Sequence, residues 1–319
     1  MHSPHPPRWK TLIAFAIIYL IWGSTFFAIR VGVHEVPPLL LAAVRFSIAG
    51  AVLFAWALAR GERFPSRREW AAMSVVALLI FVVDYGLLFW AEERVPSGTA
   101  AVILATIPAF MALAEIIVLR TARLTLRLVL ALLIGLGGVV VLMDPALGMG
   151  GAPVYTLGAA GLLIAALSWS GASVLTRKLP MPSSKVMSAA AQMLLGGVFL
   201  WIIAAAAGEA RGFHPAAVSS GAWIALAYLI VAGSIVGFTA YTWLIQHESP
   251  TRVGTYAYVN PVVAVVLGHF LGGELLNLRT VLGTVLVLAG VIVITTRRKT
   301  DVNSVTPTTL ADARAVDPT

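Results

Sequence analysis

The sequence contains no cysteine and few charged residues. The absence of cysteine among 319 residues excludes a disulfide framework, a thiolate metal site and a cysteine nucleophile. Asp, Glu, Lys and Arg make up 11% of the chain, whereas a soluble domain carries about 25%. Hydrophobic residues make up 59%, and the mean hydropathy is +0.92. We therefore expect an all-α integral membrane protein, because a helix pairs its own backbone polar groups and can lie in lipid.

The recognisable motifs of enzymes are also missing. The sequence has no HExxH zinc motif, no nucleophile elbow, no phosphate-binding glycine loop and no dense cluster of His or carboxylates. We therefore expect no enzymatic activity, no cofactor and no metal. The net charge of +8 suggests a nucleic-acid partner, but the basic residues fall in short clusters between apolar runs. This pattern is typical of membrane topology signals, so no nucleic acid is expected.

Long apolar runs follow one another along the whole chain. A helix needs about 20 residues to cross about 30 Å of hydrocarbon. Ten runs of that size are predicted as transmembrane helices, at 12–33, 38–59, 70–91, 97–119, 126–143, 154–176, 185–207, 219–245, 252–272 and 278–296.

Lys and Arg alternate between the two sides of this ten-helix pattern. They gather before the first helix, after each even-numbered helix, and at the end of the tenth. Because short cytoplasmic loops carry the excess of Lys and Arg, that side is the cytoplasm. Both chain termini are therefore expected in the cytoplasm.

The two halves of the sequence can be laid over each other. Trp22 to Arg30 and Trp169 to Arg177 share the same spacing, and Trp90 to Pro108 overlays Trp243 to Pro261. Five helices per half is an odd number, so the halves enter the membrane from opposite sides as inverted repeats. The predicted organisation is a cytoplasmic leader at 1–11, repeats at 12–143 and 154–296, and a disordered cytoplasmic tail at 297–319.

Ionisable residues inside the bilayer need a reason, since each costs at least about 2.5–3.5 kcal/mol at mid-helix. Arg45 and Asp84 are predicted at one depth, where they either hold a zwitterionic substrate or gate transport, or form a static ion pair. Glu115 is either a proton-coupling group or a carboxylate that snorkels to the interface or pairs with Arg. Glu92 and Glu93 are expected to be solvated loop residues.

Aromatic, hydroxyl and amide side chains near the middle of the predicted helices are candidates for a binding cavity. Rings with one polar handle suit small amphipathic solutes, although Trp and Tyr near helix ends also act as interface anchors. The candidate substrate-binding residues are Trp22, Ser24, Tyr85, Trp169, Gln192, Tyr241, Tyr258 and Asn260. Pro108 and Pro261, at equivalent repeat positions, are candidate hinges or static kinks.

Several short motifs resemble a known family. They are the Ile21–Thr25 stretch, Pro37-Pro38 leading into Arg45-Phe46, and Asn260-Pro261 followed by Gly272-Gly273-Glu274. The chain resembles an EamA-type member of the drug/metabolite transporter superfamily. The resemblance implies a ten-helix exporter or exchanger whose central cavity is lined by the first four helices of each repeat.

The expected function follows from this resemblance and from the intramembrane charges. Bacterial relatives export amino acids, including aromatic ones, so we expect a multi-pass inner-membrane exporter, monomeric or homodimeric, with possible proton coupling. Multidrug or organic-cation efflux and sugar-phosphate exchange are alternatives within the superfamily. Phosphate recognition calls for several cations, whereas Arg45 is the one deep cation predicted. A membrane enzyme or a channel is disfavoured.

Overall fold

The computed structural model describes residues 7–120, 124–148, 153–247, 253, 256–276 and 278–295. These residues form helices and connecting loops, with no strand among them. The first half contains α1 (Arg8–Val33), α2 (Pro38–Ala59), α3 (Arg67–Ala77), η1 (Leu78–Tyr85), α4 (Gly86–Glu92), α5 (Ser97–Leu104), α6 (Ile107–Ala114), η2 (Glu115–Leu119) and α7 (Leu126–Gly148). The second half contains α8 (Pro153–Leu175), α9 (Lys185–Ala206), η3 (Pro215–Ala217), α10 (Ser220–Tyr228), η4 (Leu229–Val236), α11 (Gly237–His247), α13 (Tyr256–Gly272) and α14 (Leu278–Thr295).

These helices agree with the spans expected from hydropathy. Seven helical stretches of the described residues are long and apolar enough to cross a membrane, and three shorter apolar helices lie in α7, α13 and α14. The third span consists of α3, η1 and α4 in succession, and the eighth of α10, η4 and α11. The first span begins at Arg8, before its expected start at 12. The predicted tail at 297–319 lies outside the described residues.

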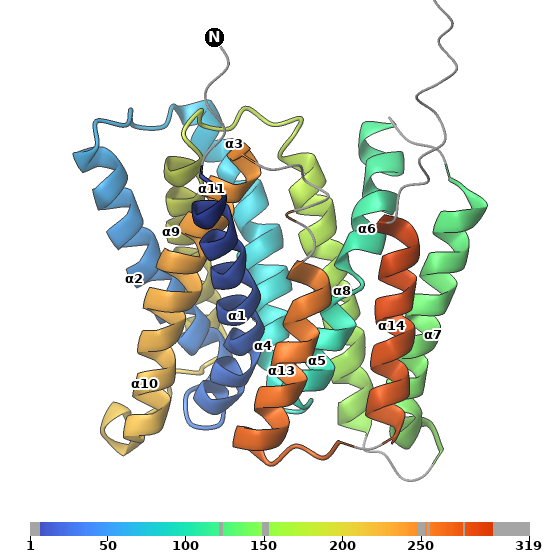
Figure 1. Cartoon of the computed structure of the whole chain (residues 1–319). Coiled ribbons are helices and arrows are strands. Elements are labelled where there is room, and N and C mark those ends of the chain that lie inside the picture. Colours follow the sequence, from blue (N-terminus) through green and yellow to red (C-terminus); the bar gives the residue numbers. More distant parts are fainter. Residues whose placement is uncertain are drawn as a thin grey trace, which may run out of the picture.

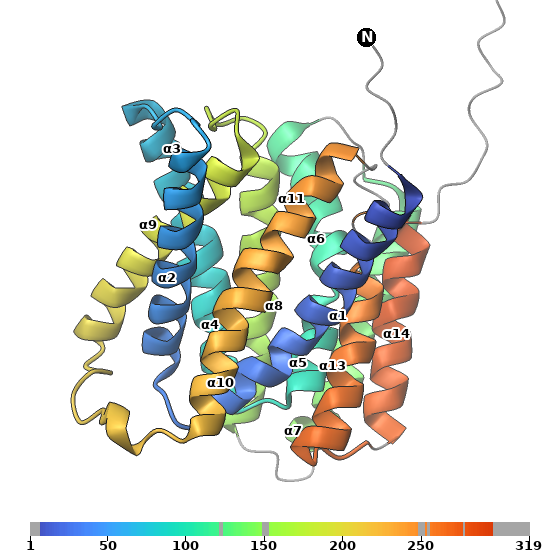
Figure 2. The same ribbon diagram turned by 60° about the vertical axis from the view of Figure 1, so that its left-hand side comes forward.

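The helices stand side by side as an upright bundle (Figures 1 and 2). The start of α1 and the end of α14 lie at the same end of the bundle, and α8 runs opposite to α1 (Figure 1). Helices from the two halves pack against each other: α2 lies along α9, α7 along α14, α1 along α13, and α8 along α6. The interface between the halves therefore runs through the middle of the molecule.

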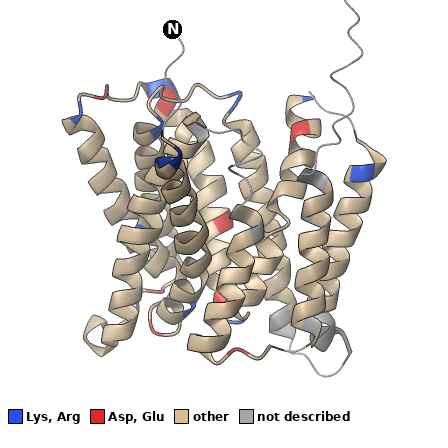
Figure 3. Cartoon of the chain, in the orientation of Figure 1, with Lys and Arg blue, Asp and Glu red and all other residues tan. Residues whose placement is uncertain are grey.

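Charged residues gather at the two ends of the bundle (Figure 3). The end where α1 starts, here called the basic end, carries most of the described cations: Arg8, Lys10, Arg60, Arg63, Arg67, Arg68, Arg120, Arg127, Arg177, Lys178 and Lys185. The opposite end, here called the acidic end, carries Glu35, Glu92, Glu93, Glu209 and Glu274. This asymmetry is the one expected when the basic end faces the cytoplasm.

Two spans change their helical geometry in the middle. The third and eighth spans each contain eight π-helical residues, η1 and η4, at corresponding places in the two halves. Single π-turns inside α-helices are frequent at functional sites. In the fourth span, α5 ends before Ala105 and Thr106, and α6 starts with Pro108 in its first turn. Pro261, by contrast, lies inside the continuous helix α13.

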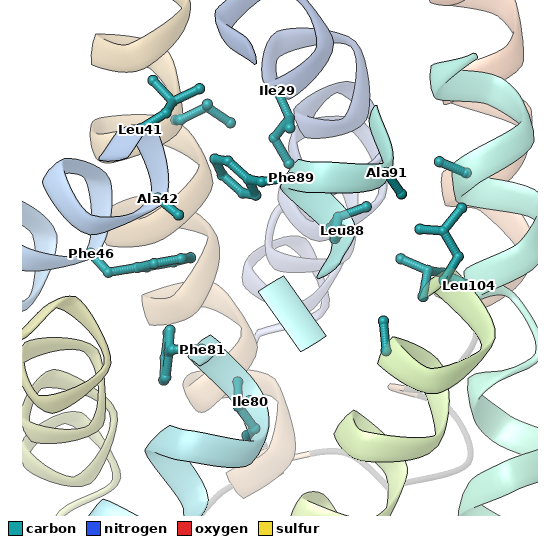
Figure 4. Packing of buried hydrophobic residues seen from close by; sticks show 14 of the residues in the cluster. Ile29, Leu41, Ala42, Phe46, Ile80, Phe81, Leu88, Phe89, Ala91 and Leu104 are labelled. Atoms are coloured by element: carbon teal, nitrogen blue, oxygen red, sulfur yellow. The ribbon is translucent and has the colours of Figure 1, made fainter. Parts of the chain in front are cut away.

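A compact aromatic cluster fixes the third span against α2 (Figure 4). Phe46 of α2, Phe81 of η1 and Phe89 of α4 are almost fully buried, and the rings of Phe46 and Phe81 lie 4.7 Å apart in an edge-on arrangement. Ile29 and Leu41 complete the cluster. Because such packing immobilises the side chains it contains, the residues at the end of η1 are held in a defined direction.

Candidate functional site

A cavity of about 90 Å³ lies between the two halves. Its walls come from α1, α2, η1, α4, α5 and α6 of the first half and from α8 and α13 of the second half. The lining residues are Trp22, Thr25, Phe26, Ile29, Arg45, Asp84, Tyr85, Leu88, Ala101, Leu104, Ala105, Ile107, Trp169, Tyr256, Ala257, Asn260 and Pro261. This central cavity thus brings together seven of the residues selected from the sequence.

Arg45 lies in the wall of the central cavity with its charge incompletely compensated. Its side chain is buried, and Nε donates a hydrogen bond to Ser234 Oγ in η4 at 3.0 Å. The guanidinium carbon lies 4.8 Å from the ring centre of Phe46 and 5.4 Å from that of Tyr85, which are cation–π distances. Nη1 is buried without a hydrogen-bond partner. The two N–H donors of Nη1 therefore remain available.

Asp84 lies in the same wall and is 3% exposed. Its Oδ1 is buried and has no hydrogen-bond partner. None of the ion pairs among the described residues joins Asp84 to Arg45, so the static ion pair considered as one alternative does not form in this structure. An acid and a base therefore line one cavity without an ion pair between them, and burying both in their charged forms costs several kcal/mol unless a ligand compensates it.

Three aromatic rings surround Trp22. Its Nε1 donates to the carbonyl oxygen of Gly233 at 3.2 Å, and its ring packs against those of Tyr241 and Tyr256 at 5.1 and 5.3 Å and against Phe238. A Cβ atom on Gly237 would lie 2.5 Å from Trp22 Nε1, closer than any real contact. Glycine at 237 therefore permits the position of the indole.

Asn260 and Tyr256 contribute from α13. The Asn260 amide nitrogen, assigned by its surroundings, lies 3.1 Å from the carbonyl oxygen of Tyr19 and 3.2 Å from that of Tyr256, so it donates to both. Tyr256 was missed by the sequence reasoning, although it stands four residues before Asn260 and hence on the same helix face. Tyr258, which was selected instead, belongs to α13, and its side chain lies outside the described part of the structure.

A second, larger cavity of about 310 Å³ opens at the basic end. It is here called the basic vestibule, and its lining residues are Ile80, Phe81, Trp169, Ser173, Thr176, Arg177, Met181, Lys185, Ser188, Ala189, Gln192, Phe238 and Tyr241. Gln192 and Tyr241, selected as binding residues, lie here and not in the central cavity. Trp169 lines both cavities, and its ring meets that of Tyr85 edge-on at 6.0 Å.

Three other selected residues line neither cavity. Ser24 shares a 2.6 Å hydrogen bond with the hydroxyl of Tyr228, because its side chain turns toward α10. Glu115 pairs with Arg177 at 3.0 Å near the basic end, as the Arg-paired alternative expects. Pro108 is next to Ile107, which lines the central cavity, but does not line it itself.

Hydrogen bonds within the first half and between the halves tie the elements of the acidic end together. Arg30 Nη1 donates to the carbonyl oxygens of Glu92 at 2.6 Å and Val95 at 2.8 Å. Arg30 Nε also lies 3.6 Å from Glu274 Oε1, and the Glu274 carboxylate accepts hydrogen bonds from Ser97. The expectation that Glu92 is solvated is wrong: its side chain is 0% exposed, and neither carboxylate oxygen has a hydrogen-bond partner. The side chain of Glu92, at the end of α4, is therefore buried instead of facing water.

Comparisons with known proteins agree with this architecture. Residues 9–143 and 156–296 match the EamA-like transporter family. The chain is 40% identical over 266 residues to the uncharacterized inner membrane transporter YedA of Escherichia coli K12, covering 83% of each protein. It is 27% identical over 288 residues to a probable terminal-alkyne amino-acid exporter of Streptantibioticus cattleyicolor, covering 90% of this chain and 94% of that protein.

A solved crystal structure also shares the fold. Its TM-score is 0.61 at 26% sequence identity, and the alignment covers 91% of this chain and 97% of the other. The two matching segments together span most of the sequence. With the 40% identical relative and the bundle of apolar helices, they lead to one conclusion. The chain is a multi-pass membrane protein that belongs to the EamA-like transporter family of the drug/metabolite transporter superfamily.

Proposed function

We propose that this protein exports small zwitterionic metabolites, most favourably amino acids with apolar or aromatic side chains, across the bacterial inner membrane. The observation that carries the proposal is the pair of unneutralised charges in the central cavity. Arg45 and Asp84 each keep a buried polar atom without a hydrogen-bond partner, and no ion pair joins them. A zwitterion supplies the missing partner to both charges at once.

Each group of the substrate has a counterpart in the cavity wall. Arg45 is assigned to the carboxylate and Asp84 to the ammonium group, since charge-assisted hydrogen bonds are the strong ones. The side chain of the substrate rests among Trp22, Tyr85 and Trp169. The cavity volume of about 90 Å³ is well below the roughly 300–1,000 Å³ of pockets for drug-sized ligands, which favours a small solute.

Transport is proposed to proceed by alternating access between two inverted repeats. The hydrogen bonds around Arg30 and Glu274 close the acidic end, while the basic vestibule leads toward the central cavity. Excess Lys and Arg at the basic end favours its assignment to the cytoplasm, with both termini there. Substrate then enters from the cytoplasm in this conformation and leaves when the acidic end opens.

The relatives and the charge of the cavity favour this substrate class over the alternatives. A related protein is named a probable terminal-alkyne amino-acid exporter. The buried guanidinium of Arg45 disfavours the binding of organic cations in the central cavity. A binding site for sugar phosphates requires more than one cation among the lining residues of this cavity. Membrane enzymes and channels lack supporting features in the sequence.

Counterflow uptake into proteoliposomes tests the proposal. Vesicles loaded with unlabelled substrate receive labelled phenylalanine, leucine, lysine or a sugar phosphate, followed by phenethylamine and phenylpropionate, which each carry one of the two charges. We expect exchange of phenylalanine, weak exchange of the singly charged analogues, and loss of exchange in Asp84→Asn and Arg45→Gln. Exchange of the sugar phosphate alone, or full exchange by both charge-deleted variants, would refute the proposal.

A further inference from the structure

The basic vestibule has a chemistry of its own. Its described lining includes two cations, Arg177 and Lys185, and no Asp or Glu. The guanidinium of Arg177 is partly neutralised, because Nη1 lies 3.0 Å from Glu115 Oε1. Lys185, the first residue of α9, takes part in none of the ion pairs of the described residues. The exposed ammonium group of Lys185 at the edge of the vestibule therefore has no carboxylate partner among the described residues.

The inner part of the vestibule is aromatic and polar. Phe81, Trp169, Phe238 and Tyr241 line it. Ser173, Thr176, Ser188 and Gln192 supply hydroxyl and amide groups. Gln192 Nε2 donates to Ser188 Oγ at 2.9 Å, so its carbonyl oxygen keeps its accepting capacity for another donor. Rings beside a cation, with hydrogen-bonding groups between them, suit a molecule with one apolar part and one carboxylate.

The vestibule and the central cavity share one wall. Trp169 lines both, and the edge-on contact with Tyr85 holds its ring between them. The helix that carries Trp169 is fixed at the next residue, where Ser170 Oγ donates to the carbonyl oxygens of Ala166 at 2.6 Å and Ile107 at 3.1 Å. The Trp169 side chain therefore separates a molecule in the vestibule from Arg45 and Asp84. This side chain can change rotamer while its helix stays in place.

We propose that the basic vestibule is a second binding site, a loading site that holds the carboxylate of the substrate before it enters the central cavity. Lys185 binds the carboxylate, the rings of Trp169, Phe238 and Tyr241 hold the apolar side chain, and Trp169 is the gate between the two sites. This inference rests on the proposed export of zwitterions, and it adds a site that acts before Arg45 and Asp84.

Binding stoichiometry tests the loading site independently of transport. The protein in nanodiscs is titrated with labelled phenylalanine. We expect two molecules bound per protein in the wild type, and one each in Lys185→Gln and in Asp84→Asn. One bound molecule in the wild type that Lys185→Gln leaves unchanged would overturn the loading site alone. No binding by any form would overturn both the loading site and the proposed function.

Transport kinetics give the second readout. With substrate added at the basic end, Lys185→Gln should raise KM for phenylalanine about three- to fivefold with little change in kcat, as expected for one lost, partly solvated charge contact. KM for phenethylamine, which has no carboxylate, should not rise. Lys178→Gln is the matched control, because it removes the same charge from a neighbouring residue that does not line the vestibule. An equal rise of KM in Lys178→Gln would refute a specific role for Lys185.

Discussion

Glu274 of the second half binds the first turn of α5 in the first half. Its Oε1 accepts hydrogen bonds from the backbone N–H and the hydroxyl of Ser97, both at 2.7 Å, and its Oε2 accepts one from the Gly98 N–H at 3.1 Å. A carboxylate at a helix N-terminus also interacts favourably with the helix dipole. This side chain thus links the two halves at the acidic end.

Glu274→Gln is expected to open the acidic end more often. The substitution removes the charge that holds Arg30 and the α5 terminus, and a charged hydrogen bond of this kind contributes about 1.5–3 kcal/mol. Since the protein has no cysteine, Thr25→Cys introduces a single thiol in the central cavity. A membrane-impermeant maleimide applied at the acidic end should label this thiol several-fold faster when Glu274→Gln is present.

Glu93→Gln is the control for this labelling experiment, because Glu93 pairs with the adjacent Arg94 within one half of the protein. Its labelling rate should equal that of Thr25→Cys alone. Equal rates in Glu274→Gln and the control would show that Glu274 does not keep the acidic end closed.

Asp84→Asn should stabilise the protein while it abolishes exchange. Asp84 is buried with one oxygen unpartnered, so replacing the carboxylate by a neutral amide of the same size removes a desolvation penalty of about 1–3 kcal/mol. The thermal midpoint in detergent should rise by about 2–4 °C for each kcal/mol. Glu62→Gln, at an exposed loop position, should leave the midpoint unchanged. A lower midpoint for Asp84→Asn would contradict an uncompensated charge at this site.

Gly237→Ala should impair transport by displacing Trp22. The added methyl group would lie 2.5 Å from Trp22 Nε1, so the indole must leave the carbonyl oxygen of Gly233 or move into the cavity. Overpacking of this kind costs about 1–3 kcal/mol, seen as a lower thermal midpoint and weaker exchange. Gly171→Ala in α8 is the matched control, because a Cβ there meets no atom within 4 Å. Identical behaviour of the two variants would refute the close approach.

The contact that Glu35 makes at the acidic end should be weakened by acid. Its carboxylate accepts 2.6 Å hydrogen bonds from the N–H and hydroxyl of Ser219, which lower the pKa of Glu35 below its ordinary value of 4.5. A lowered pKa in the folded state contributes stability above pH 4.5 that is lost as the pH falls through the folded value. Glu35→Gln should therefore lower the thermal midpoint at pH 6 more than at pH 3. A difference independent of pH would contradict this assignment.

The sequence predicted the helices well because lipid imposes a simple length rule. Apolar runs of about 20 residues marked the spans, and the charge alternation could be checked against them. It also identified Trp22, Tyr85, Trp169 and Asn260 as cavity residues, since few polar or aromatic groups lie that deep. The alignment of the halves is consistent with the matching positions of η1 and η4.

Rotation about each helix axis was the part that the sequence left open. The predicted depth in the membrane placed Arg45 and Asp84 together. Whether the two side chains form an ion pair depends on how Phe46 and Phe81 pack, and membrane depth does not determine that packing. Ser24 lies beside lining residues in sequence, yet it points to Tyr228. Glu92 belongs to a Glu-Glu-Arg stretch typical of an exposed helix end, yet it is buried, and Arg30 of α1 donates to its backbone carbonyl oxygen.

The contact between Gly237 and Trp22 has a consequence for how this family changes over evolutionary time. The two residues lie in different halves, yet neither can be replaced by a larger side chain without affecting the other. A relative with alanine or serine at the position of Gly237 should therefore carry a smaller ring or an aliphatic residue at the position of Trp22. Positions 22 and 237 should then covary among homologues, and the residue pair found there should follow the size of the transported solute.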